Sequence, residues 1–340
     1  GNFDVFLLKT DASGNLQWVK TFGGSSSDSA YSVQQTSDGG YIVAGGTYSF
    51  GAGIYDVFLL KTDASGNLQW AKTFGGSSND AARSVQQTSD GGYIVAGWTW
   101  SFGAGNSDVF LLKTDATGNL QWAKTFGGSY YDYASSVQQT SDGGYIVVGR
   151  TYSFGAGGYD VFLLKTDASG NLQWAKTFGG SSDDYAWSVQ QTSDGGYIVA
   201  GETRSFGAGS ADVFLLKTDA LGSLQWAKTF GGSDYDRVYS VQQTSDGGYI
   251  VAGGTWSFGA GSYDVFLLKT DASGNLQWIK TFGGSSGDYA YSVQQTSDGG
   301  YIVAGYTWSF GAGNSDVFLL KTDANGNIGT CAIVGSPTPT

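Results

Sequence analysis

Hydrophobic and polar positions along this chain repeat with a period of 52 residues. The clearest marker is Asp56-Val57-Phe58-Leu59-Leu60, which recurs with its aspartate at positions 4, 56, 108, 160, 212, 264 and 316. A fixed period of this length indicates one supersecondary unit copied along the chain rather than a set of unlike domains. The sequence therefore predicts a single repeat architecture over residues 1–334.

Each period contains four short strand signals separated by turn residues. In one repeat they cover residues 84–88, 93–97, 109–114 and 120–126. The first and fourth alternate polar with apolar residues, as edge strands do, whereas the second and third are nearly continuous apolar runs, as strands buried on both faces are. The turn at 89–92 carries Asp-Gly and Gly-Gly pairs, which supply the positive φ that tight hairpins need. We therefore expect an antiparallel sheet whose strands follow chain order from edge to edge.

Four-stranded sheets repeated at this spacing, with short antiparallel links and no helical periodicity, indicate the blades of a β-propeller. A single blade could not bury both of its faces, whereas blades stacked face to face can. The competing architecture is an open β-solenoid, which usually needs shorter coils and parallel stacking. The predicted fold class is all-β, a β-propeller of four-stranded antiparallel blades.

The number of blades follows from counting strands. The hairpin of the first two strands occurs six times, the third strand seven times and the tryptophan of the fourth strand six times. This count favours seven blades with an incomplete first blade; the alternative is six blades, in which 16–22 closes the blade begun at Ser292 and 3–10 is surplus. Residues 1–4 match the middle of a repeat, so we expect the natural start and any signal peptide upstream. Residues 335–340 alternate Pro and Thr, as the start of an extended linker or tail does.

The repeat resembles a known family in two of its motifs. Gly-Gly-Tyr-Ile-Val-Ala-Gly and Asp-Val-Phe-Leu-Leu-Lys-Thr-Asp-Ala-Ser-Gly-Asn-Leu-Gln-Trp resemble the SBBP-type β-propeller repeats of bacterial and archaeal surface proteins, and more distantly the kelch repeat. The kelch glycine doublet follows the second strand, whereas Gly91-Gly92 precedes it here. The resemblance implies a scaffold at the cell surface or outside the cell and names no reaction.

Composition excludes several classes of function. The net charge is −12 and the basic residues are scattered, so the chain lacks the footprint of a nucleic-acid-binding protein. There is no apolar run of about 18 residues, so we expect no membrane insertion. Histidine is absent and Cys331 is the single cysteine, which removes the commonest general base and leaves no nucleophile–base pair. The sequence therefore predicts a protein that is not an enzyme.

The repeats differ from one another at few positions, and those positions are rich in Tyr, Trp and Arg. The turns at 89–92 and 115–119 are nearly invariant, whereas the other two connections vary. One variable series, 31, 83, 135, 187, 239 and 291, is expected at the entry of the innermost strand, around the mouth of a central channel. The predicted ligand-binding residues are Tyr31, Arg83, Trp187, Tyr239, Tyr291, Tyr48, Trp98, Trp100, Arg150, Tyr152, Glu202, Arg204, Trp256, Tyr306 and Trp308.

Rigid aromatic rings and arginines among Ser, Gly and Asn are typical of binding surfaces. We therefore expect the face that carries the variable connections to bind a glycan or a protein. Two alternatives remain. Drift between recently duplicated repeats, or packing between blades, would leave the same pattern without a ligand. A subunit of a surface layer, sheath or filament would use the same loops for self-association.

Aspartates recur at fixed positions and could hold Ca²⁺, which prefers oxygen ligands. One series opens the third strand with Asp4 and its copies, and another precedes the first strand at Asp28 and its copies. No Asp-x-Asp-x-Asp-Gly run or comparable ligand set occurs. The sequence therefore predicts that these carboxylates accept backbone N–H bonds at turns, with no cofactor.

Overall fold

The computed structural model describes residues 3–329, in which short β-strands alternate with turns. Predictions about Cys331 and the tail at 335–340 lie outside the described residues. The chain divides into two compact units, one of residues 3–155 with 160–177 and the other of residues 156–159 with 178–329. Among residues 3–329, no helix is long and apolar enough to cross a membrane.

The strands of the first unit form one hairpin and three four-stranded sheets. They are β1 (Val5–Thr10), β2 (Leu16–Phe22), β3 (Asp28–Gln35), β4 (Tyr41–Thr47), β5 (Asp56–Thr62), β6 (Leu68–Phe74), β7 (Asp80–Gln87), β8 (Tyr93–Thr99), β9 (Asp108–Thr114), β10 (Leu120–Phe126), β11 (Asp132–Gln139), β12 (Tyr145–Thr151), β13 (Asp160–Thr166) and β14 (Leu172–Phe178).

The second unit contains two four-stranded sheets and one three-stranded sheet. Its strands are β15 (Asp184–Gln191), β16 (Tyr197–Thr203), β17 (Asp212–Thr218), β18 (Leu224–Phe230), β19 (Asp236–Gln243), β20 (Tyr249–Thr255), β21 (Asp264–Thr270), β22 (Leu276–Phe282), β23 (Asp288–Gln295), β24 (Tyr301–Thr307) and β25 (Asp316–Thr322).

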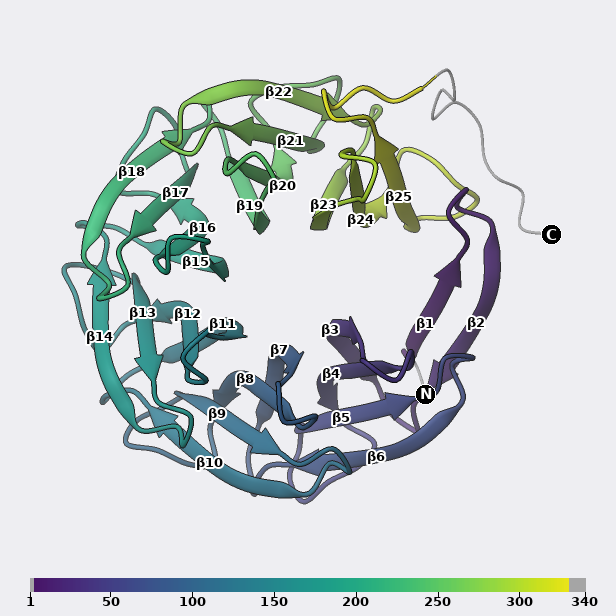
Figure 1. The fold of residues 1–340 in the computed structure, drawn as a ribbon, viewed down its shortest axis with the longest axis vertical. Coiled ribbons are helices and arrows are strands. Elements are labelled where there is room, and N and C mark those ends of the chain that lie inside the picture. The colour runs from purple at the N-terminus through teal and green to yellow at the C-terminus, as the bar shows by residue number, and fades with distance from the viewer. Residues whose placement is uncertain (1–2, 330–340) are drawn as a thin grey trace. The chain divides into compact units, whose positions relative to one another are not determined.

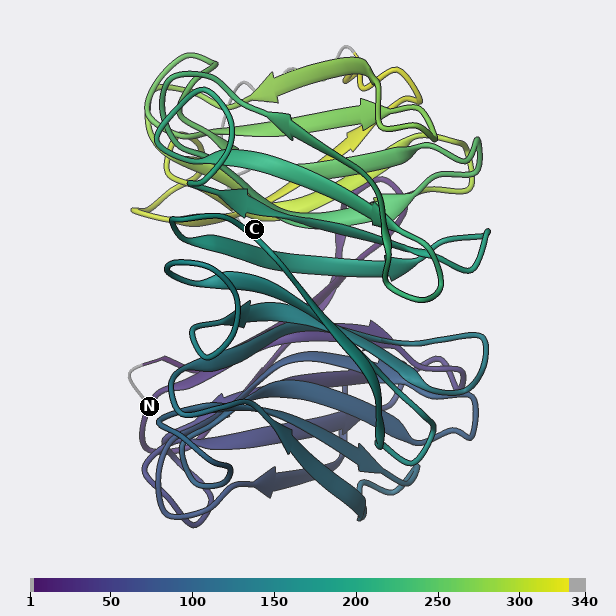
Figure 2. The same ribbon diagram turned by 90° about the vertical axis from the view of Figure 1, so that its left-hand side faces the viewer.

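Within a blade the four strands are antiparallel neighbours in chain order, as predicted (Figure 1). The predicted strands match closely except for the first, because β7 begins at Asp80, four residues before the predicted start. The turns behave as expected: Gly91 and Gly118 have φ of 84° and 79°. In either unit the connections lie at both ends of the strands (Figure 2).

The prediction of seven blades was wrong, because residues 3–329 form six. Five blades have four strands and the sixth, β23–β25, has three. The hairpin β1–β2 forms a two-stranded sheet and is not counted as a blade. It packs on the β3–β6 blade through Val5 and Leu7. The strand at 16–22 pairs with β1 and does not complete the blade begun at Ser292.

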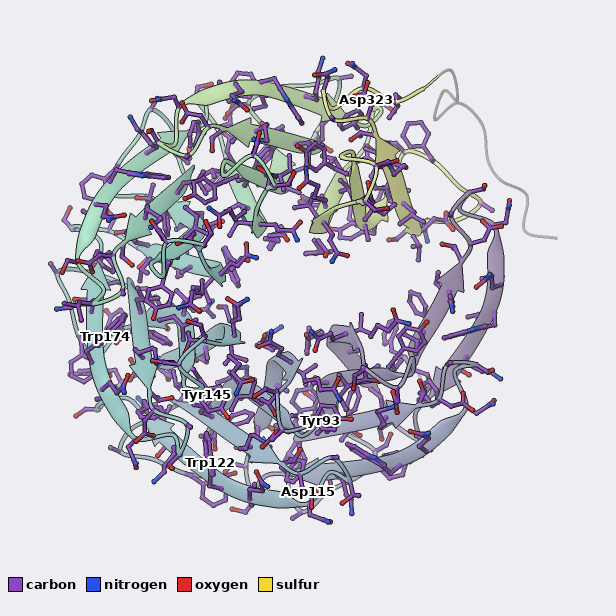
Figure 3. The ribbon with its side chains drawn as sticks, in the orientation of Figure 1. Tyr93, Asp115, Trp122, Tyr145, Trp174 and Asp323 are labelled. Carbon is purple, nitrogen blue, oxygen red and sulfur yellow. The ribbon has the colours of Figure 1, made fainter. Side chains whose placement is uncertain are left out.

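The apolar core lies between successive blades rather than inside one sheet. Val57 and Leu59 of β5 pack against Phe110 and Leu112 of β9 in the next blade, and the same arrangement recurs along each unit. The fourth strand adds its tryptophan: Trp122 of β10 lies 5.8 Å from Tyr145 of the next blade (Figure 3). This burial is the main stabilising term, so each blade depends on its neighbour.

The first strand of each blade contains a β-bulge that sequence reasoning did not find. In β7 the pairing steps from Ala82 opposite Gly97 to Ser84 opposite Ala96, so Arg83 has no partner on β8. A bulge adds one residue to one strand of an antiparallel pair. The glycine at this place, Gly97, is invariant in all six repeats, because a Cβ there would overlap the carbonyl oxygen of Ala81.

Polar side chains occupy the edge of the first strand, where backbone groups would otherwise lack partners. The Val85 N–H donates to Ser32 Oγ at 3.1 Å, and the Gln87 N–H donates to Gln34 Oε1 at 2.6 Å. The same bonds join β19 to β23 in the second unit. Satisfied edge groups protect a sheet from pairing with foreign strands. These bonds explain why each repeat keeps its Ser and Gln residues.

A buried lysine holds the invariant Ser-Asp-Gly-Gly turn in place. Lys113, only 3% exposed, lies with its Nζ 2.9 Å from Asp90 Oδ2 and also donates to Thr114 O and Gln121 Oε1. A buried ammonium needs such a set of acceptors. The same lysine–aspartate pair recurs in the other blades, so the identity of this turn in all six repeats has a structural cause.

Candidate functional site

The predicted ligand-binding residues share three positions of the repeat, and we call their side chains the variable surface. The positions are the bulge of the first strand, the sixth residue of the second strand and the first residue after it. In the first unit the variable surface comprises Tyr31, Tyr48, Arg83, Trp98, Trp100, Arg150 and Tyr152; in the second unit it comprises Trp187, Glu202, Arg204, Tyr239, Trp256, Tyr291, Tyr306 and Trp308.

The series that begins at Tyr31 lies within the first strand, at the bulge, and not at the strand entry as expected. The reason is that this strand starts earlier than its sequence pattern suggests. Bulges re-aim a side chain relative to the regular alternation of a strand. As a result, bulge residues of neighbouring blades touch: Tyr239 lies 5.8 Å from Trp187 and 4.7 Å from Tyr291.

In the first unit most of the variable surface falls into two clusters, and Tyr152 packs against Tyr130 with 5.8 Å between the ring centres. The first cluster contains Arg83, whose guanidinium lies 4.1 Å from the ring centre of Tyr31. The buried Tyr55 joins this pair to Tyr48, because its hydroxyl contacts that of Tyr31 and its ring packs on that of Tyr48. The second is a set of rings and one cation from β8, β11 and β12 and the adjoining connections. Its members are Trp98, Trp100, Tyr133 and Arg150.

In the second unit the aromatic contacts are continuous across three blades. Rings follow one another at 4.7–5.8 Å between centres, in the order Trp187, Tyr239, Tyr291, Tyr306, Tyr289, Tyr263 and Trp256. Burial first, and then neighbouring tyrosines, raise the pKa of Tyr239 and Tyr289 to about 12. These hydroxyls therefore stay protonated at neutral pH and can donate hydrogen bonds.

Two of the predicted charged residues of the second unit are paired within the protein. Glu202, the only glutamate of the chain, is 4% exposed, and its Oε2 lies 3.3 Å from Nε of Arg237. Arg204 is exposed, with Nη1 3.8 Å from Asp183 Oδ2. A buried carboxylate with a guanidinium partner is suited to holding Arg237 in place. Glu202 is therefore a buried residue that positions Arg237 rather than an exposed member of the surface.

The recurring aspartates accept hydrogen bonds at turns, as predicted. Asp132 Oδ2 accepts the Gly128 N–H at 2.8 Å and the Ser153 hydroxyl at 2.7 Å, and Asp108 Oδ2 accepts the Ala104 N–H at 2.8 Å. Burial raises the pKa of Asp108, which is also close to Asp132. Within residues 3–329, no three Asp, Glu, Cys or His side chains lie together as a metal site.

A cavity of 480 Å³ opens in the first unit, and its lining includes none of the predicted ligand-binding residues. Phe126, Phe162, Leu164 and Leu172 line it. Its one carboxylate belongs to Asp132, whose Oδ2 is already engaged at a turn. Lys176 is the other charged residue of the lining.

Sequence reasoning missed several residues that complete the variable surface. Tyr55 and Tyr263 immediately precede a third strand, and Tyr133, Arg237 and Tyr289 are second residues of a first strand. These positions also vary between repeats, as Ser29 and Ala81 show at the equivalents of Tyr133. Variation at these two positions was therefore the available signal.

Comparison with known proteins supports the blade architecture. A family described as "Domain of unknown function (DUF5122) beta-propeller" matches residues 296–328. The Regulatory protein FlaEY of Caulobacter vibrioides is 30% identical over 154 residues, which cover 38% of this chain and 16% of that protein. The chain thus spans well under two thirds of this relative.

Two solved structures were also found at low identity. Sqt1 from Chaetomium thermophilum has a TM-score of 0.46 at 10% identity and covers 89% of this chain and 83% of its own. The Pan2 WD40 domain of Neurospora crassa has a TM-score of 0.49 at 12% identity, with 81% and 85% covered. The strand topology and the family match together define the class of this protein, which is a β-propeller repeat domain.

Proposed function

We propose that the protein is a non-catalytic recognition module, outside the cell or on its surface, that binds a glycan or a protein through the variable surface. One observation carries this proposal: the positions that differ between otherwise near-identical repeats touch one another and are mostly Tyr, Trp and Arg. Drift without selection would favour small polar residues at exposed sites, since exposed tryptophan lowers solubility. Trp256 and Trp308 are nevertheless 48% and 57% exposed.

The first prediction concerns these exposed rings. Changing Trp100, Trp256, Trp308 and Arg204 together to Ser is expected to weaken binding at least tenfold, because aromatic and arginine side chains dominate contact energy. The measurement is a glycan array and a pull-down from a secreted-protein extract, each followed by titration of the hits.

The matched control changes the same number of half-exposed side chains elsewhere. Leu68, Leu120, Leu224 and Leu276, which begin the fourth strands, are each 51–52% exposed, and changing all four to Ser should leave binding unchanged. Equal loss in both variants, or no ligand for the intact protein, would count against the proposal.

The second candidate function is a subunit that assembles with copies of itself. The face of β25 favours it, because Val317 and Leu319 are 53% and 43% exposed while their equivalents Val57 and Leu59 are at most 2% exposed. Inside the chain that face is covered by the phenylalanine and leucine of a following blade. The exposed Phe6 of β1 offers the same kind of side chain to a second copy. A head-to-tail contact of this type builds rings or filaments.

Assembly predicts that the protein's mass in solution rises with concentration. Val317→Lys with Leu319→Lys should return the protein to monomers, because a charged side chain is costly to bury. Multi-angle light scattering after size exclusion measures the mass. A monomer at every concentration would exclude this candidate, and the Trp variants above should then decide the first one.

A further inference from the structure

The four arginines of the chain lie at or beside the variable surface, and each is close to a tyrosine ring. The distances from guanidinium carbon to ring centre are 4.1 Å for Arg83 and Tyr31, 4.7 Å for Arg150 and Tyr133, and about 6 Å for Arg204 and Arg237 with Tyr235. A guanidinium over a ring uses its flat face and keeps N–H donors on its edge. The arrangement therefore leaves hydrogen-bonding capacity at the surface.

The arginines differ in whether a carboxylate of the protein forms an ion pair with them. Arg204 pairs with Asp183 and Arg237 with Glu202. Arg83 is exposed and, among residues 3–329, forms no ion pair. In a chain with 29 acidic residues, a cation at the surface without an acidic partner is suited to an anion from outside.

The side chains around Arg83 add neutral donors and an aromatic face. The Tyr31 hydroxyl lies 3.5 Å from the hydroxyl of Tyr55, whose ring centre is 4.4 Å from that of Tyr48. Burial, then Tyr31, raises the pKa of Tyr55 well above its ordinary value, so it remains neutral. Tyr31 and Tyr48 are 46% and 52% exposed. A carboxylate on the arginine would thus lie beside open rings.

We propose that Arg83, Tyr31 and Tyr48 bind a uronic acid unit of an anionic polysaccharide. The carboxylate accepts a two-point hydrogen bond from the Arg83 guanidinium, and the sugar ring lies against the exposed tyrosines. This inference rests on the recognition function proposed above and names its ligand class. The net charge of −12 opposes a polyanion at long range, so the affinity depends on this short-range pair.

The repeat favours a polysaccharide over an acidic peptide. The same unit carries a second arginine over a tyrosine, Arg150 with Tyr133, on a neighbouring blade. A polyuronate presents one carboxylate on every sugar, which suits two arginines on neighbouring blades even though they occupy different positions of the repeat.

Isothermal titration with oligogalacturonate, and with its methyl ester as a neutral probe of the same shape, tests the proposal. We expect the intact protein to bind the acid at least tenfold more tightly than the ester. Arg83→Ser should weaken acid binding about tenfold to a hundredfold, the range of a charged hydrogen bond. Arg83→Lys keeps the positive charge and loses the two-point hydrogen bond of the guanidinium. Its affinity for oligogalacturonate should lie between those of the intact protein and Arg83→Ser.

Lys124→Ser is the matched control, because it removes an exposed cation of β10 in the same unit, outside the variable surface; it should leave oligogalacturonate binding unchanged. Folding of Arg83→Ser is expected, since Ser135 occupies the same bulge position. Binding of acid and ester alike, indifferent to Arg83, would overturn the carboxylate site while leaving glycan recognition intact. Arg83-dependent binding of poly-glutamate but not of oligogalacturonate would overturn the glycan assignment.

Discussion

Gly253→Ala is expected to destabilise the second unit by about 2–3 kcal/mol, the usual cost of inserting a methyl group where no space exists. Gly253 pairs with Val238, next to the bulge at Tyr239. Its added Cβ would overlap the backbone oxygen of Arg237. Backbone atoms of a bulged strand cannot move aside without loss of ladder hydrogen bonds. Urea unfolding followed by circular dichroism gives the change in free energy.

The adjacent glycine provides the control for this variant. Gly254→Ala places its Cβ 2.9 Å from a ring carbon of Tyr289, a side chain that can rotate. Other repeats carry Trp98, Arg150 and Glu202 at this position, so the backbone tolerates a side chain. We expect less than about 1 kcal/mol for Gly254→Ala. If both variants unfold at the same urea concentration, the bulge does not explain the invariant glycine.

This pair of glycines illustrates what the sequence could and could not predict about the fold. Alternation and apolar runs located three strands within one or two residues and placed all four in order. The bulge remained hidden because polar alternation breaks at Arg83 and its equivalents, so the first half of the strand read as a loop. An invariant glycine in an apolar run was the signal for a bulge or a close backbone approach.

The prediction of the number of blades failed for a different physical reason. Counting strand signals treats each one as evidence of a blade, but a blade needs the first two strands to build its sheet. The hairpin β1–β2 has two strands and packs on its neighbour through Val5 and Leu7. Sequence gives the number of strands, whereas pairing decides which sheets they join.

The composition of the candidate site was visible in the sequence, but its internal pairing was not. Differences between repeats marked Arg83 and Glu202 equally. Only the structure shows that Glu202 is buried against Arg237, whereas Arg83 faces solvent over Tyr31. Contacts between residues about 35–52 positions apart depend on how adjacent blades stack. No local pattern along the chain encodes them.

Stability is expected to fall steeply between about pH 4 and pH 2. Burial, the largest single influence, would raise the pKa of Asp90, but the Thr88 hydroxyl, the Lys113 ammonium and the Gly92 N–H outweigh it and lower the pKa from 3.8 to about 2. The equivalent carboxyls Asp142, Asp194 and Asp246 behave alike. A carboxyl with a lowered pKa stabilises the folded state above its unfolded pKa, and this contribution disappears as the pH falls through the folded value.

The size of this acid effect follows from the four copies. The difference between 3.8 and about 2 corresponds to roughly 2 kcal/mol per carboxyl, which solvent screening reduces to roughly 1 kcal/mol because these carboxylates are about half exposed. Four copies therefore contribute roughly 4 kcal/mol, a large share of the stability of an ordinary domain. The Asx-turn carboxyl of Asp115, whose pKa hydrogen bonds from Asn119 and Thr117 lower to about 2, titrates in the same window.

Urea unfolding at fixed ionic strength, measured from pH 2 to pH 6, checks this prediction. The intact protein should lose stability only below about pH 4. Asp90→Asn should be less stable at pH 6, because Lys113 then keeps a buried ammonium without its carboxylate. Between pH 4 and pH 2 its free energy of unfolding should also change less steeply with pH, by the contribution of one titrating carboxyl. Asp234→Asn, at an exposed carboxylate whose side-chain contact is the neighbouring Ser233 hydroxyl, supplies the control and should follow the intact protein. A flat profile from pH 4 to pH 2 would show that the lysine–aspartate pairs do not stabilise the blades.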